Sequence, residues 1–130
     1  MKAQAALEFM AIVGIQLLVL ALVIVYFYTN YQSTVQQLDA AKARDAVEKI
    51  SATAQVVSLQ GPPAKQTIVV DMPTNVESVN VTGHEVLFKL ATGGEAYAYS
   101  PTLINGSVQA TAGTTMITIE ALQGVVQVTG

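Results

Sequence analysis

The first part of the chain is a long apolar run. Residues 9–28 contain no charge and no proline, and Gln16 is the only polar residue among them. As a helix rising about 1.5 Å per residue, this segment spans the roughly 30 Å hydrocarbon core of a bilayer. The run ends in an aromatic cluster of Tyr26, Phe27, Tyr28 and Tyr31. Such clusters are typical of membrane interfaces, so the pattern predicts a membrane-spanning helix.

Two simpler interpretations of this segment are a cleaved secretory signal and a plain membrane anchor. The flanks do not fit a secretory signal, because Lys2 is the only basic residue before the run and no small-x-small site follows the tyrosines. A single-pass anchor fits the length and composition well. The residues that follow distinguish the anchor from a longer element.

Beyond residue 28 the pattern becomes amphipathic. Apolar residues recur mostly three or four positions apart, at Tyr31, Val35, Leu38, Val47, Ile50, Ala54 and Val57. This spacing predicts that the helix continues and that one of its faces needs a partner. The triplet Gly61-Pro62-Pro63 is a stop signal. We therefore expect one helix over residues 4–60, hydrophobic at 9–28 and amphipathic at 29–60, which is longer than a mere anchor requires.

From residue 64 onwards the chain consists of short runs rich in Val, Ile, Thr and Tyr. Several runs alternate: Val86, Phe88 and Leu90 point to one face, and Tyr97 and Tyr99 share a face. The pair Gly93-Gly94 predicts a hairpin. Asn105-Gly106 predicts another turn.

These runs predict a β domain over residues 64–130. We expect an antiparallel sheet or small sandwich of about six or seven strands. Its own core would be modest, so we expect it to dock onto the distal half of the helix. The predicted fold class is α+β, a long N-terminal α-helix followed by a small β domain.

Composition narrows the possible functions. The chain has 130 residues, of which 52% are hydrophobic and 12% charged, and its net charge is −3. The few Lys and Arg form no basic stripe, so nucleic acid is not an expected partner. There is no cysteine, which excludes disulfides, thiolate zinc sites and thiol catalysis.

The chain shows no catalytic, cofactor or metal motif. The single histidine, His84, has no nucleophile beside it, and Thr92-Gly93-Gly94 lacks the lysine and the following helix of a phosphate-binding loop. The domain's carboxylates are dispersed at Asp71, Glu77, Glu85, Glu95 and Glu120. We expect no enzymatic activity, cofactor or metal, although folding can still bring two acids together.

Two triplets are N-glycosylation sequons. They are Asn80-Val81-Thr82 and Asn105-Gly106-Ser107, which we expect in turns or at strand ends. Glycans on Asn80 and Asn105 would place the β domain outside the membrane. The same domain is rich in Ser, Thr, Asn and Gln, which indicates a polar coat with little charge.

The segment KAQAALEF, residues 2–9, followed at once by the apolar run, resembles the processing region of archaeal type IV pilins with a class III signal peptide. The resemblance implies that a prepilin peptidase removes the leader 1–3 by cutting between Ala3 and Gln4. Glu8 then becomes the fifth mature residue, where pilins carry their glutamate, with Phe9 beside it in the assembly segment. In this family the assembly machinery transfers membrane-inserted subunits into an extracellular filament whose core is packed N-terminal helices, and the outer domain serves adhesion.

A carboxylate at Glu8 has a physical explanation in such a filament. Removal from water is costly unless the charge is paired, so we expect a partner in the new amino group of Gln4 on a neighbouring identical subunit. The helix dipole alone would contribute about 0.3–1 kcal/mol. Small residues would allow close helix approach, namely Ala5, Ala6, Ala11, Gly14 and Ala21.

Other functions remain open at this point. The first is a single-pass, membrane-anchored extracellular binding domain that never polymerises. The second is an archaellin, the filament protein of the archaeal motor, although archaellins usually carry a larger outer domain. A membrane-tethered enzyme is the last alternative.

Overall fold

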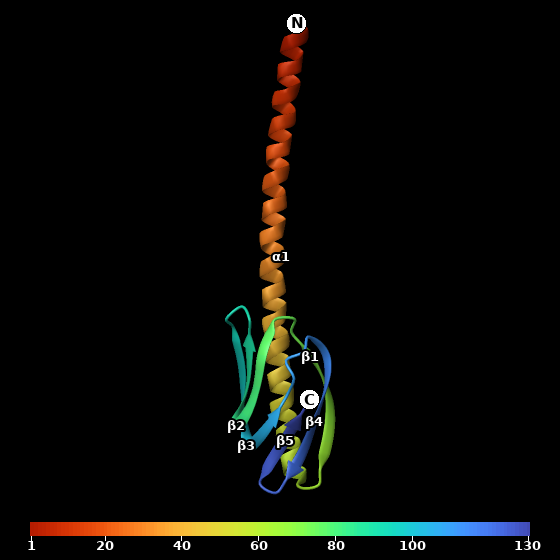
Figure 1. The fold of residues 1–130 in the computed structure, drawn as a ribbon, viewed down its shortest axis with the longest axis vertical. Coiled ribbons are helices and arrows are strands. Elements are labelled where there is room, and N and C mark those ends of the chain that lie inside the picture. Colours follow the sequence, from red (N-terminus) through yellow and green to blue (C-terminus); the bar gives the residue numbers. More distant parts are fainter. The chain divides into compact units, whose positions relative to one another are not determined.

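The computed structural model, which describes residues 1–130, has an α+β fold and confirms the predicted class (Figure 1). One long helix precedes five strands, the layout of pilin-like folds. The elements are α1 (Lys2–Gln60), β1 (Lys65–Met72), β2 (Val76–Leu90), β3 (Glu95–Ser107), β4 (Gly113–Leu122) and β5 (Val125–Thr129). The chain divides into two compact units, Met1–Val35 and Gln36–Gly130, which are described separately.

The helix α1 agrees with the predicted 4–60 to within two residues. It begins at Lys2 because no proline or glycine opposes helix formation there. It ends at Gly61, which has a φ of 73° and whose N–H lies 3.2 Å from the Val57 carbonyl and 3.1 Å from the Ser58 carbonyl. Glycine adopts this left-handed conformation at little steric cost, so the sequence signal and the helix end coincide.

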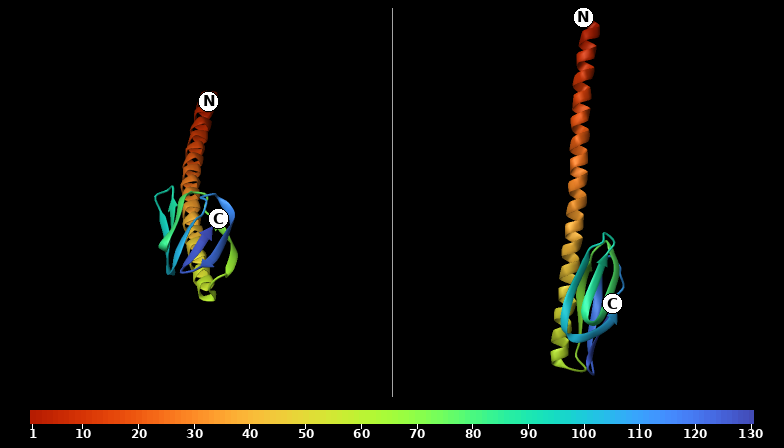
Figure 2. Two further views of the ribbon diagram at one scale, coloured as in Figure 1. Left: turned by 60° about the horizontal axis from the view of Figure 1, so that its bottom comes forward. Right: turned by 90° about the vertical axis from the view of Figure 1, so that its left-hand side faces the viewer.

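The five strands form a single sheet in the order β1-β4-β5-β3-β2. The pairs β1–β4, β4–β5 and β2–β3 are antiparallel, whereas β3 and β5 are parallel. Gly93-Gly94 lies in the connection between β2 and β3, so the predicted hairpin is confirmed. Within the unit Gln36–Gly130, the sheet lies along one side of the helix (Figure 2).

The prediction of six or seven strands was wrong because two strands are longer than the sequence indicated. β2 continues through Gly83, and its register against β3 shifts between Gly83 and Glu85. β3 likewise continues through Pro101. Glycine and proline usually mark strand ends, but here both lie where the pairing of β2 with β3 is irregular, so neither residue ends its strand.

The turn predicted at Asn105-Gly106 was also wrong. Both residues lie in β3, where Gly106 is aligned with Val128 of the parallel strand β5. A Cβ atom at Gly106 would overlap the backbone carbonyl of Val128. Glycine therefore serves here for close approach of two backbones rather than for a turn.

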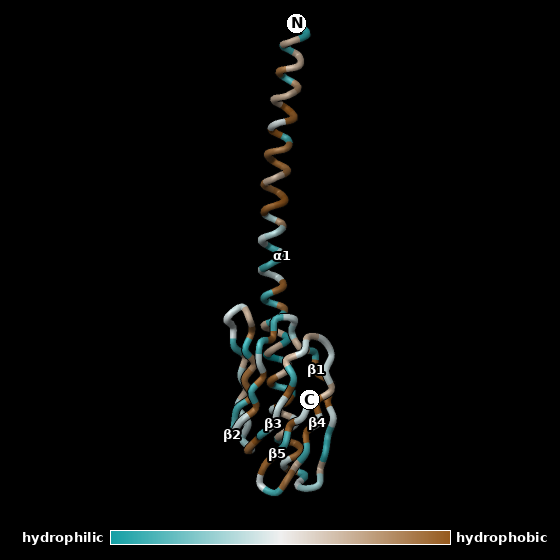
Figure 3. Tube along the Cα trace, viewed as in Figure 1, coloured by the Kyte–Doolittle hydropathy of each residue, from teal (hydrophilic) through white to brown (hydrophobic).

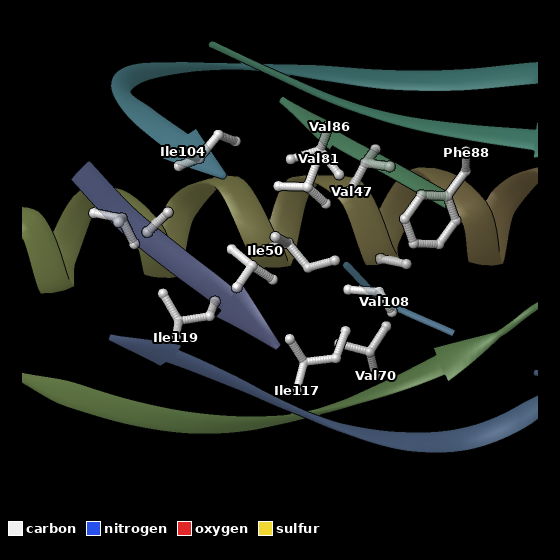
Figure 4. Packing of buried hydrophobic residues seen from close by; sticks show 14 of the residues in the cluster. Val47, Ile50, Val70, Val81, Val86, Phe88, Ile104, Val108, Ile117 and Ile119 are labelled. Atoms are coloured by element: carbon white, nitrogen blue, oxygen red, sulfur yellow. The ribbon is translucent and has the colours of Figure 1, made fainter. Parts of the chain in front are cut away.

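The core lies between the sheet and the distal part of α1, as predicted (Figure 4). Val47 and Ile50 of the helix face strand residues that include Val86 and Ile117. These four side chains are fully buried. The helix contributes Ala43, Ala46, Val47, Ile50, Ala54 and Val57. Three of these six are alanines, which let the helix lie close to the sheet.

The buried helix face starts later than the amphipathic pattern indicated. Tyr31 and Leu38 are exposed and Val35 is half-buried, whereas Asp39 is the first buried residue of α1. The predicted apolar face is buried at Val47, Ile50, Ala54 and Val57. Helical periodicity carries no information on where along the helix the partner surface begins.

Candidate assembly site and the outer face of the sheet

The unit Met1–Val35 is a helical segment without a core of its own. Apart from half-buried Val13, the large apolar side chains at positions 9–28 are between 42% and 74% exposed. In Figure 3 the tube is mostly brown, the hydrophobic colour, along this part of α1. By length and composition α1 includes a segment able to cross a membrane, and none of that segment is buried by the rest of the chain.

The uncharged part of the helix extends beyond the apolar run. No charged residue occurs between Glu8 and Asp39. Two polar side chains that precede Tyr31 form hydrogen bonds with the helix backbone. The Thr29 hydroxyl and the Asn30 amide each donate to the Tyr26 carbonyl at 2.9 Å. Such internal bonds lower the cost of removing these groups from water.

Glu8 is the one charge next to this surface. Its side chain is exposed and makes no ion pair or hydrogen bond within the chain, although Lys2 lies in the same helix. Glu8 lies beyond the first turn of α1, where the effect of the helix dipole has fallen off, and no group of the chain uses the hydrogen-bonding capacity of its carboxylate. The arrangement provides an anionic group at the start of an apolar surface.

The predicted processing residues lie in the first turn of α1. Ala3 and Gln4 are both helical and exposed. The first turn is closed by the Ala5 N–H, which donates to the Met1 carbonyl at 3.2 Å. Terminal turns fray easily, so a peptidase can reach the bond between Ala3 and Gln4 after local opening. Phe9 follows at the start of the apolar run and is also exposed.

The outer face of the sheet, opposite the helix, carries aligned rows of polar residues beside exposed side chains such as Val69, Tyr97 and Met116. One row crosses all five strands, because the pairings align Lys65, Glu120, Gln127, Asn105 and Thr82. A second row contains Thr67, Thr118, Thr129 and Ser107. We call these aligned residues the polar rows. The prediction of a polar coat with little charge agrees with them.

The two sequons lie on this outer face. Asn80 is in the interior of β2, contrary to the expected turn or strand end, and Asn105 is near the end of β3. Thr82 is aligned with Asn105, and its hydroxyl donates to the Asn80 side-chain oxygen at 2.7 Å. The expectation failed at Asn80 because β2 continues through Gly83 without a turn.

The carboxylates of the β domain do not assemble into a site. Three of them lie beside lysines: Asp71 with Lys42 at 3.0 Å, Glu120 with Lys65 at 3.7 Å, and Glu95 with Lys89 at 3.8 Å. Glu77 and Glu85 form no ion pair. No group of three or more His, Asp or Glu side chains is arranged to hold a metal ion.

Sequence reasoning missed a buried carboxylate. Asp39 is only 3% exposed and accepts hydrogen bonds from the Thr74 hydroxyl at 2.8 Å and from the Thr74 N–H at 3.3 Å. It therefore fastens the connection between β1 and β2 to the helix. Its position on the helical face shared with Ala43 and Ala46 was the available signal, but an isolated Asp on an amphipathic helix is usually exposed.

His84, which has no nucleophile beside it in the sequence, is exposed at the surface. Its ring stacks on Tyr99 with centroids 5.8 Å apart, and its Nδ1 lies 3.0 Å from the Ser100 carbonyl oxygen. Tyr97 and Tyr99 share the outer face, as the alternation predicted. The stacking itself was not predictable, because it depends on the register between β2 and β3.

Comparison with protein-family models, curated proteins and solved structures finds no match to this chain.

Proposed function

We propose that this protein is the structural subunit of an extracellular filament of the type IV pilus kind, which polymerises through its N-terminal helix and serves surface adhesion. The observation that carries this proposal is the exposure of apolar side chains around the helix of Met1–Val35. A helix that is apolar on all sides requires an apolar environment. The chain itself supplies none.

Lipid provides that environment before assembly. Residues 9–28 match the length of about 20 residues that spans a bilayer, and their aromatic end suits the interface. In this state the partners are the membrane, a prepilin peptidase and the assembly machinery. The segment KAQAALEF supports processing of this kind by its resemblance to archaeal type IV pilins.

Identical helices provide the environment after assembly. Burial from water contributes roughly 1.5–3 kcal/mol for each large aliphatic or aromatic side chain, so a bundle of such helices is stable outside the membrane. Close approach is favoured by the small residues Ala5, Ala6, Ala11, Gly14 and Ala21. A repeated contact between different surfaces that does not close into a ring produces an open helical filament.

Glu8 provides a means of setting the register between subunits. A cut between Ala3 and Gln4 creates a positive amino group, and Glu8 has no partner in its own chain. Pairing of the Gln4 amine with Glu8 of a neighbouring subunit satisfies both charges within the filament core. An unpaired carboxylate there is costly, so misaligned subunits are disfavoured.

The experiment that tests the proposal is expression in an archaeal host with and without a prepilin peptidase. We expect cell-surface filaments only with the peptidase, visible by negative-stain microscopy of sheared material. Mass spectrometry of the filament subunit should give an N-terminal peptide that begins at Gln4. The same spectra should show a glycan on Asn80, Asn105 or both.

A matched pair of variants isolates the role of Glu8. We expect Glu8→Gln to be processed normally but to give at least about tenfold fewer filaments, because every subunit addition then lacks a charge-assisted pair. Glu48→Gln, at an exposed glutamate of the same helix, should assemble like the unmodified chain. Normal filaments from Glu8→Gln would contradict the pairing with the Gln4 amine.

The alternative is a single-pass, membrane-anchored extracellular β domain. The same apolar segment favours this alternative, because α1 is long and apolar enough to cross a membrane. It predicts a protein that begins at Met1, stays monomeric after extraction into detergent and tolerates Glu8→Ala. An archaellin-type filament would instead rotate with the archaeal motor, and cells lacking the protein would then lose swimming rather than surface attachment.

A further inference from the structure

The outer face of β3 carries two exposed tyrosines. Tyr97 and Tyr99 are each 70% exposed, and neither hydroxyl forms a hydrogen bond within the chain. Alternate residues of a strand lie about 6.6–6.8 Å apart on the same face, so the two rings stand side by side. A ring this exposed leaves a large apolar area in contact with water, and a ligand that covers the ring removes that area from water.

The neighbouring strand β2 adds two polar groups beside these rings. The register between β2 and β3 shifts between Gly83 and Glu85, and two consecutive residues there, His84 and Glu85, are exposed to solvent. Irregular pairing of strands can re-aim side chains next to a site. Glu85 is aligned with Tyr99, on whose ring His84 stacks at 5.8 Å.

Together these residues border a shallow pocket. It has a volume of about 360 Å³ and is lined by Thr82, His84, Glu85, Tyr97 and Tyr99. We call it the tyrosine pocket. The His84 Nδ1 lies 3.0 Å from the Ser100 carbonyl oxygen, so the imidazole is held in place against Tyr99. One wall of the pocket is therefore organised before any ligand arrives.

The polar rows extend from the tyrosine pocket across the sheet. Thr82 at the edge of the pocket is aligned with Asn105, which is aligned with Gln127 of β5. These three residues offer hydroxyl and amide groups without charge. The outer face thus combines an aromatic platform with a line of neutral hydrogen-bonding groups.

We infer that the tyrosine pocket binds an uncharged polysaccharide with a flat, β-linked chain. The axial C–H bonds of a pyranose ring pack against the electron-rich face of an aromatic ring. Its equatorial hydroxyls reach outward, where the Glu85 carboxylate and the Thr82 hydroxyl oxygen can accept hydrogen bonds from them. Tyrosine suits this task because it offers a large contact area and loses little conformational entropy.

Other ligand chemistries fit less well. An anionic ligand would be repelled by Glu85, which has no lysine or arginine partner. An ammonium ligand is best held by rings that enclose it, whereas Tyr97 and Tyr99 extend from one strand on one face. The site lies within Gln36–Gly130 and does not depend on filament assembly.

The test measures binding of cellohexaose and chitohexaose to the full, unassembled chain by isothermal titration calorimetry. The chain is kept in a polyoxyethylene detergent, whose head group contains neither sugar nor ammonium. We expect saturable binding of at least one oligosaccharide, with little dependence on salt. Multivalent filaments would bind the corresponding insoluble polysaccharide more strongly.

Four variants define the site. Tyr97→Leu and Tyr99→Leu keep apolar bulk but remove the ring, and each should weaken binding about tenfold, as expected for one lost stacking contact. Tyr99→Phe should remain within about threefold of the unmodified chain, because it keeps the ring. The matched control is Met116→Ala, which is 71% exposed on the outer face away from the pocket and should not change binding.

The outcomes separate the possibilities. Absence of binding to both oligosaccharides overturns the inference without affecting the filament proposal. Equal loss in the Met116→Ala and tyrosine variants also overturns it, because binding would then be non-specific. Binding of tetramethylammonium that weakens steeply with salt and is abolished by Glu85→Gln would show a cation site instead.

Discussion

The two parts of α1 differ in how their apolar side chains are covered. In Gln36–Gly130 the helix packs on the sheet, and Val47, Ile50 and Val57 are fully buried. In Met1–Val35 the apolar side chains are more numerous but remain exposed. The chain itself thus buries the apolar side chains at one end of α1, whereas those at the other end require an external partner.

The difference follows from composition as well as from position. The distal helix has a single apolar face, and charged residues such as Arg44, Glu48 and Lys49 lie on its exposed side, which suits a helix with one side in water. The proximal helix has no such polar face over residues 9–28. Stability of the β domain and stability of an assembly should therefore respond to different mutations.

The largest effect on the β domain is expected from Gly106→Ala. The new methyl group overlaps the Val128 carbonyl, so β3 and β5 must separate or the sheet must shift. We expect a loss of more than about 3 kcal/mol of unfolding free energy, at the upper end for single substitutions. Denaturant unfolding followed by the circular dichroism of the sheet checks this in detergent.

The matched control lies in the other part of the molecule. A methyl group at Gly14 meets no atom within 4 Å, and alanine is a better helix former by about 0.8–1 kcal/mol. Gly14→Ala should leave the unfolding of the β domain unchanged. If it destabilises the sheet as much as Gly106→Ala does, the two parts of the chain are not energetically separate.

A second pair of truncations compares the two parts directly. Ile50→Ala creates a cavity in the core and should cost about 2–5 kcal/mol of unfolding free energy. Leu18→Ala removes an exposed side chain and should change the same quantity by less than about 0.5 kcal/mol. The unfolding midpoint in denaturant distinguishes them, and the comparison fails if Leu18→Ala shifts it equally.

The smallest effect concerns the start of the buried helix face. Asp39→Ala removes two hydrogen bonds to Thr74 and should cost about 1–3 kcal/mol. Asp45→Ala, at an exposed carboxylate 4.0 Å from Lys49, should cost less than about 0.5 kcal/mol. Hydrogen exchange of the Thr74 amide gives a direct readout, because faster exchange is expected only in the Asp39 variant.

Local signals in the sequence predicted some elements well. The end of α1 coincides with Gly61-Pro62-Pro63, and the first strand begins at Lys65, next to the predicted start of the β domain at residue 64. The hairpin at Gly93-Gly94 is also correct. These features depend on backbone conformation and side-chain alternation over a few residues, which neighbouring residues largely determine.

Other features depend on segments far apart in the chain. The continuity of β2 across Gly83 and the role of Gly106 follow from strand pairing, because a glycine in a turn and a glycine at a close approach have the same local sequence signal. The stacking of His84 on Tyr99 likewise requires the register of β2 against β3. The tyrosine pocket was therefore not accessible from the sequence.

By itself, the sequence determined that an apolar helix precedes a β domain, and it marked Ala3, Gln4 and Glu8 as candidate processing and assembly residues. Only the tertiary structure decided where along the helix burial by the sheet begins, which is at Asp39. The reason is physical: periodicity reports that a surface is apolar, but burial depends on another surface that lies next to it in space.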